Sequence, residues 1–433
     1  MKTLLAHPTG NQNFRQLGAV LHAHGLLGLT ASCLSWNLDG TLGRLLPTGV
    51  RGRLSRRSFG PWAAGMATRP WLEPARLAAQ KLGWRGATAH ERGWCCVDAV
   101  YRDFDQWLAR KLPAWQREHG LDAVYAYEDG ALAQFRRAKD LGLRCFYDQP
   151  IGHWKAARRL LGEEAERLPE WAATLTGNLD STAKLERKDA ELAAADVVFA
   201  ACQFTAETLA ASGMPTTTPV VVTPYGAPPP ITEEEWAARW TGRAAGGPLR
   251  AIFVGGLSQR KGLAEVFAAV RQLRPHVELT VIGLPPPGVS CAALQRGLRD
   301  CRYLPSLSHA EVLREMRAHD VLLFPSLFEG FGLVILEAMS QGVPVITTRH
   351  TGGPEVIRHG EDGFLVPIRD ADAIAGLLAG LVRDRARLRD LSRAAWHRSG
   401  EFTWESYGAK VAAGVRAGAE PGRPMANEGL SPI

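Results

Sequence analysis

Two glutamates eight residues apart, Glu329 and Glu337, flank a glycine-containing loop and could bind the hydroxyl groups of a sugar. Carboxylates accept hydrogen bonds from hydroxyls well. Where a glycine loop leads into a helix, the exposed N–H groups and the positive helix end favour a phosphate. Two carboxylates would repel that phosphate unless the ligand also carries hydroxyls, as a nucleotide sugar does. The alternative is an ordinary strand–turn–helix with a solvated glutamate.

A buried strand and a helix should position these carboxylates. Val321–Phe324 is short, apolar and followed by Pro325, which predicts a buried parallel strand. Residues 333–341 predict a helix that Gly342 ends. Glu337 would lie about two turns into this helix, and because helical side chains lean toward the N-terminus, it would point back at the loop.

The loop between strand and helix contains two glycines. Gly330 and Gly332 lack a Cβ, which would let a ligand approach the backbone closely. Together with Phe331 they form the predicted phosphate end of the site.

Two adjacent cations, Arg260 and Lys261, begin a second predicted strand–loop–helix unit, whose strand is Leu249–Val254. The positive end of a helix disfavours cations. A bound diphosphate would compensate for this unfavourable placement. A surface cation pair without a ligand is the alternative.

These motifs resemble those of GT-B glycosyltransferases, especially family 4. The stretch from Glu329 to Glu337 is similar to the E-x7-E motif, whose first glutamate contacts the donor sugar and whose second contacts the nucleotide ribose. Lys261 matches the family lysine that binds the donor pyrophosphate. Gly256 stands at the usual arginine position, so Arg260 would substitute from the next loop position.

The resemblance implies further site residues in both halves of the chain. His153, just beyond a predicted strand, would lie near the donor sugar and the acceptor, and Tyr303 with Leu304 would hold the base through main-chain contacts. Gly10 and Asn11 lie in a loop that faces the acceptor in the family. The predicted catalytic residues are His153 and Glu329, the acceptor-side residues are Gly10 and Asn11, and the donor-binding residues are Arg260, Lys261, Tyr303, Leu304, Gly330, Phe331, Gly332 and Glu337.

Composition places the chain among globular proteins of two or three domains. It has 433 residues, of which 46% are hydrophobic, and no run of 18 apolar residues that would predict a spanning helix. The first residues form too short an apolar run for a signal peptide. Seven cysteines, odd in number and scattered without a C-x-x-C pair, predict reduced thiols and a cytoplasmic location.

The positive charge is concentrated in one segment. Residues 44–85 contain nine basic side chains and one acidic side chain, together with Trp62, Trp71 and Trp84, whereas the whole chain has a net charge of +7. This pattern fits an anionic membrane surface, such as the inner membrane face, or an anionic acceptor. It would also fit a nucleic acid, which the family resemblance does not lead us to expect, or a solvated basic loop.

The D-x-D sequence from Asp103 to Asp105 lies in the middle of a predicted helix. In the other large glycosyltransferase fold this tripeptide binds a metal and follows a strand. Residues two apart on a helix face different ways. We therefore expect both aspartates on a solvated face and a reaction without a metal or another cofactor.

The predicted fold is α/β of the GT-B type, with two doubly wound domains facing each other across a cleft. The predicted reaction moves a hexosyl unit from a nucleotide-diphosphate sugar to a glycan or lipid-linked acceptor, with retention as family 4 implies. A nucleotide-sugar epimerase and a non-catalytic sugar-nucleotide-binding subunit remain alternatives. The predicted parts are an acceptor domain at 1–230 with an insertion at 44–94, a linker at 231–247, a donor domain at 248–395, a returning helix at 396–418 and a tail at 419–433.

Overall fold

The computed structural model describes residues 1–418 except 37, 39, 45, 46, 48–50, 52, 53, 215, 216 and 242–246. The predicted tail at 419–433, five residues of the predicted linker and several residues of the basic segment therefore lie outside the described residues.

The first half of the chain forms a seven-stranded parallel sheet in the order β3-β2-β1-β4-β5-β6-β7. Both faces are covered, because neighbouring residues of each strand enter different apolar clusters: Tyr125 and Phe146 enter one, Val124 and Cys145 the other. This explains why the strands are almost continuously apolar. The strands are β1 Thr3–Ala6, β2 Leu27–Ser32, β3 Ala67–Thr68, β4 Ala123–Tyr127, β5 Arg144–Gln149, β6 Val197–Ala200 and β7 Val220–Val222.

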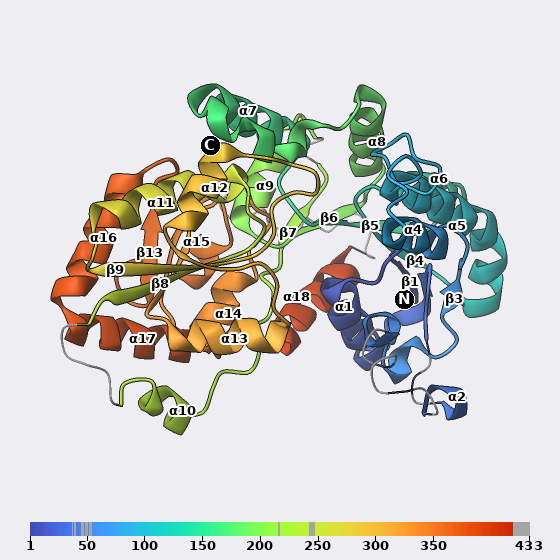
Figure 1. The fold of residues 1–433 in the computed structure, drawn as a ribbon. Coiled ribbons are helices and arrows are strands. Elements are labelled where there is room, and N and C mark those ends of the chain that lie inside the picture. The colour runs from blue at the N-terminus through green and yellow to red at the C-terminus, as the bar shows by residue number, and fades with distance from the viewer. Residues whose placement is uncertain are drawn as a thin grey trace.

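Helices connect these strands and cover the sheet (Figure 1). They are α1 Gln12–Ala23, α2 Thr41–Arg44, α4 Leu72–Lys81, α5 Val97–His119, α6 Leu132–Asp140, α7 Trp154–Arg167, α8 Thr182–Ala193 and α9 Gln203–Ala210, with 3-10 turns at Ser55–Arg57, Pro61–Ala63, Pro169–Thr174 and Thr176–Asn178.

The second half forms a six-stranded parallel sheet in the order β10-β9-β8-β11-β12-β13. Two doubly wound sheets in one chain confirm the predicted fold class. The strands are β8 Leu249–Val254, β9 Val277–Ile282, β10 Arg302–Leu304, β11 Val321–Phe324, β12 Val345–Thr348 and β13 Gly363–Val366. The helices are α10 Glu233–Ala238, α11 Leu263–Gln272, α12 Ala292–Arg299, α13 His309–Ala318, α14 Val334–Ser340, α15 Gly353–Val356, α16 Ala371–Arg383, α17 Arg385–Ser399 and α18 Trp404–Ala417.

The last described helix, α18, returns to the first half of the chain and lies beside α1 (Figure 1). A Cβ on Gly408 would come within 2.3 Å of the Val20 side chain, and one on Gly414 within 2.7 Å of Phe199. Glycine at these two positions therefore permits the close packing of α18 against the first sheet and its helices.

The basic segment packs against the first domain instead of forming a free loop. Phe59 and Trp62 stack edge-on against Phe14, with ring centroids 5.5 and 5.8 Å apart. Arg57 and Arg76 pair with the buried Glu73. Four arginines of this segment donate to partners within the protein, namely Arg51, Arg57, Arg69 and Arg76. For these four, the solvated-loop alternative is wrong.

Candidate functional site

Glu329 meets both predicted cations. Its Oε2 lies 3.3 Å from Arg260 Nη1 and in direct contact with Lys261 Nζ. Arg260 also donates to the Phe328 carbonyl at 2.6 Å. The three side chains come from loops at the carboxyl ends of β8 and β11, which are neighbouring parallel strands. Ligands in open α/β sheets gather at this edge.

Lys261 is buried and Arg260 is half-buried. Lys261 is 8% exposed, and its ammonium lies 4.8 Å from the centre of the Phe324 ring. Burial, and then the neighbouring Arg260, lower the pKa of Lys261, whereas contact with the Glu329 carboxylate favours the ammonium form. Burial lowers the pKa of Arg260 to about 10. A buried and a half-buried cation that share one carboxylate would be stabilised by a further anion such as a phosphate.

The first half of the chain fixes the backbone next to these cations. Thr174 Oγ1 accepts from the N–H of Gln259 at 3.0 Å, and the Thr174 carbonyl accepts from Ser258 Oγ at 2.6 Å. The Gln259 amide, which is fully buried, donates to Glu164 of α7 at 2.7 Å. Arg260 is therefore held by contacts from both domains.

The glycines of the central loop are explained by protein neighbours. A Cβ on Gly330 would lie 1.9 Å from the Pro150 carbonyl oxygen, so glycine is needed where the two domains meet. Gly332 has a φ of +84°, and a Cβ there would lie 2.7 Å from the Phe324 ring. Phe331 is buried against Tyr225, with ring centroids 5.3 Å apart. At Gly330, the space that a ligand was expected to use is taken by Pro150.

Glu337 lies in the first turn of α14. The prediction that it lies two turns into the helix was wrong, because the helix begins at Val334, three residues before Glu337 and thus within one turn of it. Its Oε1 lies 3.0 Å from Nε2 of the exposed His309, which is the first residue of α13. Nothing in the spacing of the sequence indicated this partner.

Tyr303 and Leu304 lie on β10, the edge strand of the second sheet. The Tyr303 hydroxyl donates to the Gly283 carbonyl at 3.1 Å, and the Gly283 N–H donates to the Leu304 carbonyl at 3.2 Å. Both residues thus adjoin the loop that follows β9.

His153 caps the N-terminus of α7 and is 3% exposed. Its Nδ1 accepts from the Lys155 N–H at 3.3 Å, which assigns the proton to Nε2, and Nε2 lies 3.1 Å from Asp189 Oδ1. Burial lowers the pKa of His153. Both ring nitrogens therefore have protein partners. His153 is nevertheless close to the candidate site, because the neighbouring Gly152 lies against the Phe328 ring of the central loop.

Gly10 is covered by the basic segment, whereas Asn11 is exposed. Gly10 has a φ of +61°, and a Cβ there would lie 2.4 Å from the Phe59 ring. Asn11 Oδ1 accepts from the Phe14 N–H at 2.8 Å and caps α1. Burial, and then the charge of Arg57, lower the pKa of His7 in the same loop to about 3.

Two cavities adjoin Arg260, which lines both. One, of about 260 Å³, lies among the loops that follow β8 and β9 and includes Ser258 and Leu284. The other, of about 250 Å³, combines Phe328 from the second half with residues of the first half, namely Glu128, Trp154, Arg158, Asp180 and Lys188. Trp154 and Lys188 were not predicted as site residues. They lie on segments distant in the sequence that meet only in the folded chain, so no local pattern could indicate that they line one cavity.

The D-x-D aspartates have structural partners. Asp103 forms two hydrogen bonds of 3.0 Å with Arg69. Asp105 is 6% exposed and accepts from the backbone N–H groups of Ala133 and Gln134 at 2.7 and 2.9 Å. The solvated face predicted for both was wrong for Asp105, which caps the start of α6.

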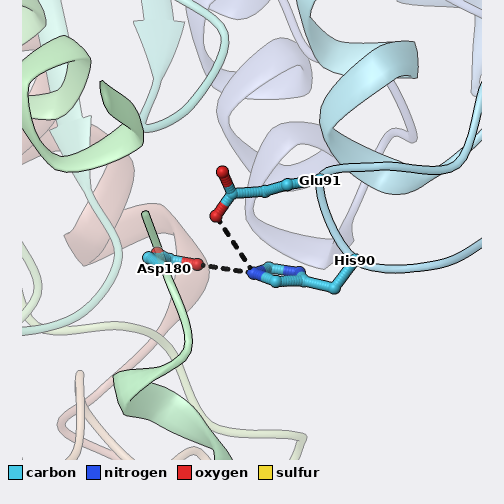
Figure 2. A group of neighbouring side chains, drawn as sticks. All are labelled: His90, Glu91 and Asp180. Carbon is cyan, nitrogen blue, oxygen red and sulfur yellow. Dashed lines mark ion pairs between the residues drawn. The ribbon is translucent and has the colours of Figure 1, made fainter. Parts of the chain in front are cut away.

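His90, Glu91 and Asp180 form a group of side chains of the types that bind metal ions (Figure 2). His90 Nε2 lies 3.0 Å from Asp180 Oδ1 and 3.3 Å from Glu91 Oε1. Lys184 Nζ is 3.0 Å from the same Asp180 oxygen, and Lys188 Nζ is 3.3 Å from the other. These ammonium groups balance the carboxylates and would repel a cation. We interpret the group as an ion-pair network that ties the end of the insertion to the cavity wall at Asp180.

Comparison with known proteins identifies relatives of the second half. Residues 234–398 match the family model described as glycosyl transferases group 1. Glycogen synthase of Mycobacterium tuberculosis H37Rv is 32% identical over 180 residues, which is 39% of this chain and 44% of the relative. The glycosyltransferase AmsK of amylovoran biosynthesis in Erwinia amylovora is 34% identical over 151 residues, 32% of this chain and 37% of the relative. The chain thus matches less than half the length of these curated relatives.

Solved structures resemble nearly the whole chain. Sucrose-phosphate synthase from Thermosynechococcus elongatus superposes with a TM-score of 0.62 at 18% identity. The superposition covers 96% of this chain and 98% of the synthase chain. HepE of Anabaena, in complex with UDP and glucose, gives a TM-score of 0.61 at 14% identity, with 96% and 99% covered. At these identities the likeness establishes the fold, which is GT-B.

Proposed function

We propose that the whole chain transfers a hexosyl unit from a nucleotide-diphosphate sugar to a glycan or lipid-linked acceptor, a proposal supported by the match of residues 234–398 to the glycosyl transferases group 1 model. The observation that carries the proposal is the convergence of Glu329 with Arg260 and Lys261 beside two cavities. A cytoplasmic role in polysaccharide biosynthesis would suit such an enzyme.

In this proposal the diphosphate of the donor binds the two cations. Arg260 and Lys261 would stabilise the negative charge that develops on the leaving diphosphate. As phosphate takes over the cations, the Glu329 carboxylate becomes free to accept from hydroxyls of the hexose. Glu337 would accept from the ribose. The transfer would proceed with retention, as in family 4, and would need no metal.

His153 is proposed to act near the donor sugar. Because its Nε2 lies 3.1 Å from Asp189 Oδ1, a hydrogen bond from His153 to the sugar requires that contact to be exchanged. Tyr303 and Leu304 would contact the base through the adjoining loop.

We place the acceptor in the 250 Å³ cavity that Arg260 and Phe328 share with the first half. Trp154 offers an aromatic face for a sugar ring, and Glu128 with Asp180 offers carboxylates for its hydroxyls. The cavity lies at the carboxyl ends of β4 and β5, so an acceptor there would sit next to the donor phosphate site.

The proposed membrane contact lies in the exposed part of the insertion. Trp71, Trp84 and Trp94 are 67%, 58% and 60% exposed, and Lys81 and Arg85 beside them are also exposed. Indole rings and basic side chains together favour the interface of an anionic bilayer. Among the described residues, no helix combines the length and apolar character needed to cross a bilayer.

Incubation of the purified chain with a panel of nucleotide-diphosphate sugars and glycan acceptors tests the proposal. We expect acceptor-dependent release of the nucleoside diphosphate, retained configuration in the NMR spectrum of the product, and unchanged activity in excess EDTA. Conversion of the donor to its epimer without acceptor would indicate an epimerase instead. Binding without consumption of any donor would indicate a non-catalytic subunit.

A further inference from the structure

A cavity of about 820 Å³ lies at the amino ends of the strands of the second sheet, opposite the candidate site at their carboxyl ends. Its lining residues Pro248, Glu278 and Asp320 stand at the amino ends of β8, β9 and β11, whereas Arg260 and Glu329 follow the carboxyl ends. Volumes of this size are typical of sites for small molecules. The cavity is therefore physically separate from the donor and acceptor sites.

Arginines dominate its lining. Five arginines and two carboxylates, Glu278 and Asp320, line the cavity, an excess of three positive charges. The buried Asp320 is shared, since Arg250 Nη2 lies 3.3 Å from Oδ1 and Arg385 Nη1 lies 3.9 Å from Oδ2. The five arginines are Arg239, Arg250, Arg317, Arg385 and Arg389.

Two of the five arginines hold the wall in place. Arg239 donates to the carbonyls of Gln341 and His319. Arg317 donates to Gln341 Oε1 from two of its nitrogens and to Glu235 Oε1 at 2.6 Å. Arg385 donates to the Gly247 carbonyl at 2.7 Å from Nη2, and Arg250 donates to Asp320 from Nη2. The other N–H groups of these two arginines, and the guanidinium of Arg389, can donate to a ligand.

Helix α17 contributes two of the five arginines, Arg385 and Arg389. It begins directly after Asp384, whose carboxylate caps the helix by accepting from the Arg387 N–H at 2.9 Å. The Arg389 guanidinium rests on the Trp236 ring, 5.8 Å from its centre, and stacking of this kind leaves the N–H edges of an arginine free. An anion in the cavity would offset the mutual repulsion of the guanidinium groups, which outnumber the two carboxylates of the lining.

We propose that this cavity binds a phosphorylated small molecule, with its phosphate held by Arg250, Arg385 and Arg389. Guanidinium groups present two parallel N–H donors that match phosphate oxygens. Trp240, which also lines the cavity, offers an aromatic surface for the organic part of the ligand. Because the site shares no residue with the donor site, the inference does not depend on the proposed transfer reaction.

Calorimetric titration of the full chain with pyrophosphate and with a hexose phosphate tests the site. Both titrations are made in the Lys261→Ala background, so that the donor phosphate site contributes little. Arg389→Gln is the main variant, because it leaves the Asp320 pairs intact, and Arg385→Gln/Arg389→Gln is the second. Arg393→Gln is the matched control: Arg393 lies on the same helix and 5.6 Å from the same Trp236 ring but is not part of the lining.

We expect saturable binding that weakens about tenfold or more in Arg389→Gln, weakens further in the double variant and stays unchanged in Arg393→Gln. If the hexose phosphate binds more tightly than pyrophosphate, the natural ligand is of the sugar phosphate class. If pyrophosphate binds more tightly, the natural ligand is a free polyphosphate. Absence of saturable binding to either probe would overturn the proposal. So would equal affinities in all variants, or an equal loss in the Arg393→Gln control.

Discussion

Lys261→Ala is the most direct perturbation of the candidate donor site. The side chain is almost fully buried, contacts Glu329 and lies over the Phe324 ring. If a diphosphate binds here, Lys261 supplies a charge-assisted hydrogen bond in a water-poor environment. Alanine removes that donor without introducing a new polar group.

The expected loss follows from the burial. A hydrogen bond to a charged group contributes about 1.5–3 kcal/mol, which corresponds to a dissociation constant raised roughly 10- to 150-fold. Folding stability should fall as well, because Glu329 loses one of its two cations. Arg260 remains 3.3 Å from the same carboxylate, so the fall should stay below the roughly 3–5 kcal/mol typical of a broken buried pair.

Calorimetry with a nucleoside diphosphate, UDP first, measures the affinity, and urea denaturation measures the free energy of unfolding. Lys410→Ala, an exposed lysine on α18, is the control for loss of one positive charge. The double variant Lys261→Ala/Glu329→Gln should not recover affinity, because it lacks the same ammonium donor, and its stability should stay below that of the unaltered chain, because Arg260 then lacks its carboxylate partner. Loss of stability with unchanged affinity in Lys261→Ala would refute the donor role and leave the pair a structural one.

Three further predictions follow from particular side chains. Glu337→Gln should weaken the binding of the free nucleoside diphosphate and of the sugar nucleotide alike, because both contain the ribose. Glu329→Gln should slow transfer without weakening the binding of the nucleoside diphosphate. If both variants weakened that binding equally, the assigned roles would be wrong. Trp84→Ser/Trp94→Ser should abolish salt-sensitive co-sedimentation with anionic vesicles, and equal binding of the unaltered chain to neutral vesicles would contradict the membrane proposal. Burial raises the pKa of Glu355 to about 7 from 4.5; the folded state therefore holds an extra proton between these values, and the free energy of unfolding should fall as pH rises through this window. Burial raises the pKa of Asp148 and Glu191 as well, so Glu355→Gln should make that slope shallower in denaturation curves without removing it, and an unchanged slope would exclude a contribution from Glu355.

The local pattern of the sequence predicted the elements around the candidate site well. The strand at Val321–Phe324 is present as predicted, and the strand at Leu249–Val254 lies beside it in the sheet. Because both strands are parallel, their following loops had to meet at one edge, so the proximity of Arg260 and Glu329 could be expected. Apolar runs, glycines and prolines carry this information because they act on the chain within a few residues.

Contacts between distant segments could not be predicted in this way. The Pro150 carbonyl that occupies the space above Gly330 comes from the other domain, so the glycine was first interpreted as room for a ligand. The arginines at 57, 69 and 76 were interpreted by composition alone, yet their partners Glu73 and Asp103 turn them inward. A charge count over a segment cannot distinguish paired from unpaired arginines.

The ion pair of Glu329 with the two cations links stability to function. In the structure the carboxylate pairs with both Arg260 and Lys261, so both cations are held in place before any ligand arrives. A diphosphate must displace that carboxylate to gain full contact with Lys261, and the displaced carboxylate then needs donors of its own. A hexose attached to the diphosphate supplies them as hydroxyls, whereas a free diphosphate does not. The full donor should therefore bind more tightly than the free diphosphate, and this difference should disappear in Glu329→Gln, where no charge has to be re-solvated. If the difference persisted unchanged in Glu329→Gln, the sugar would be recognised by other side chains, and Glu329 would serve only to hold the cations.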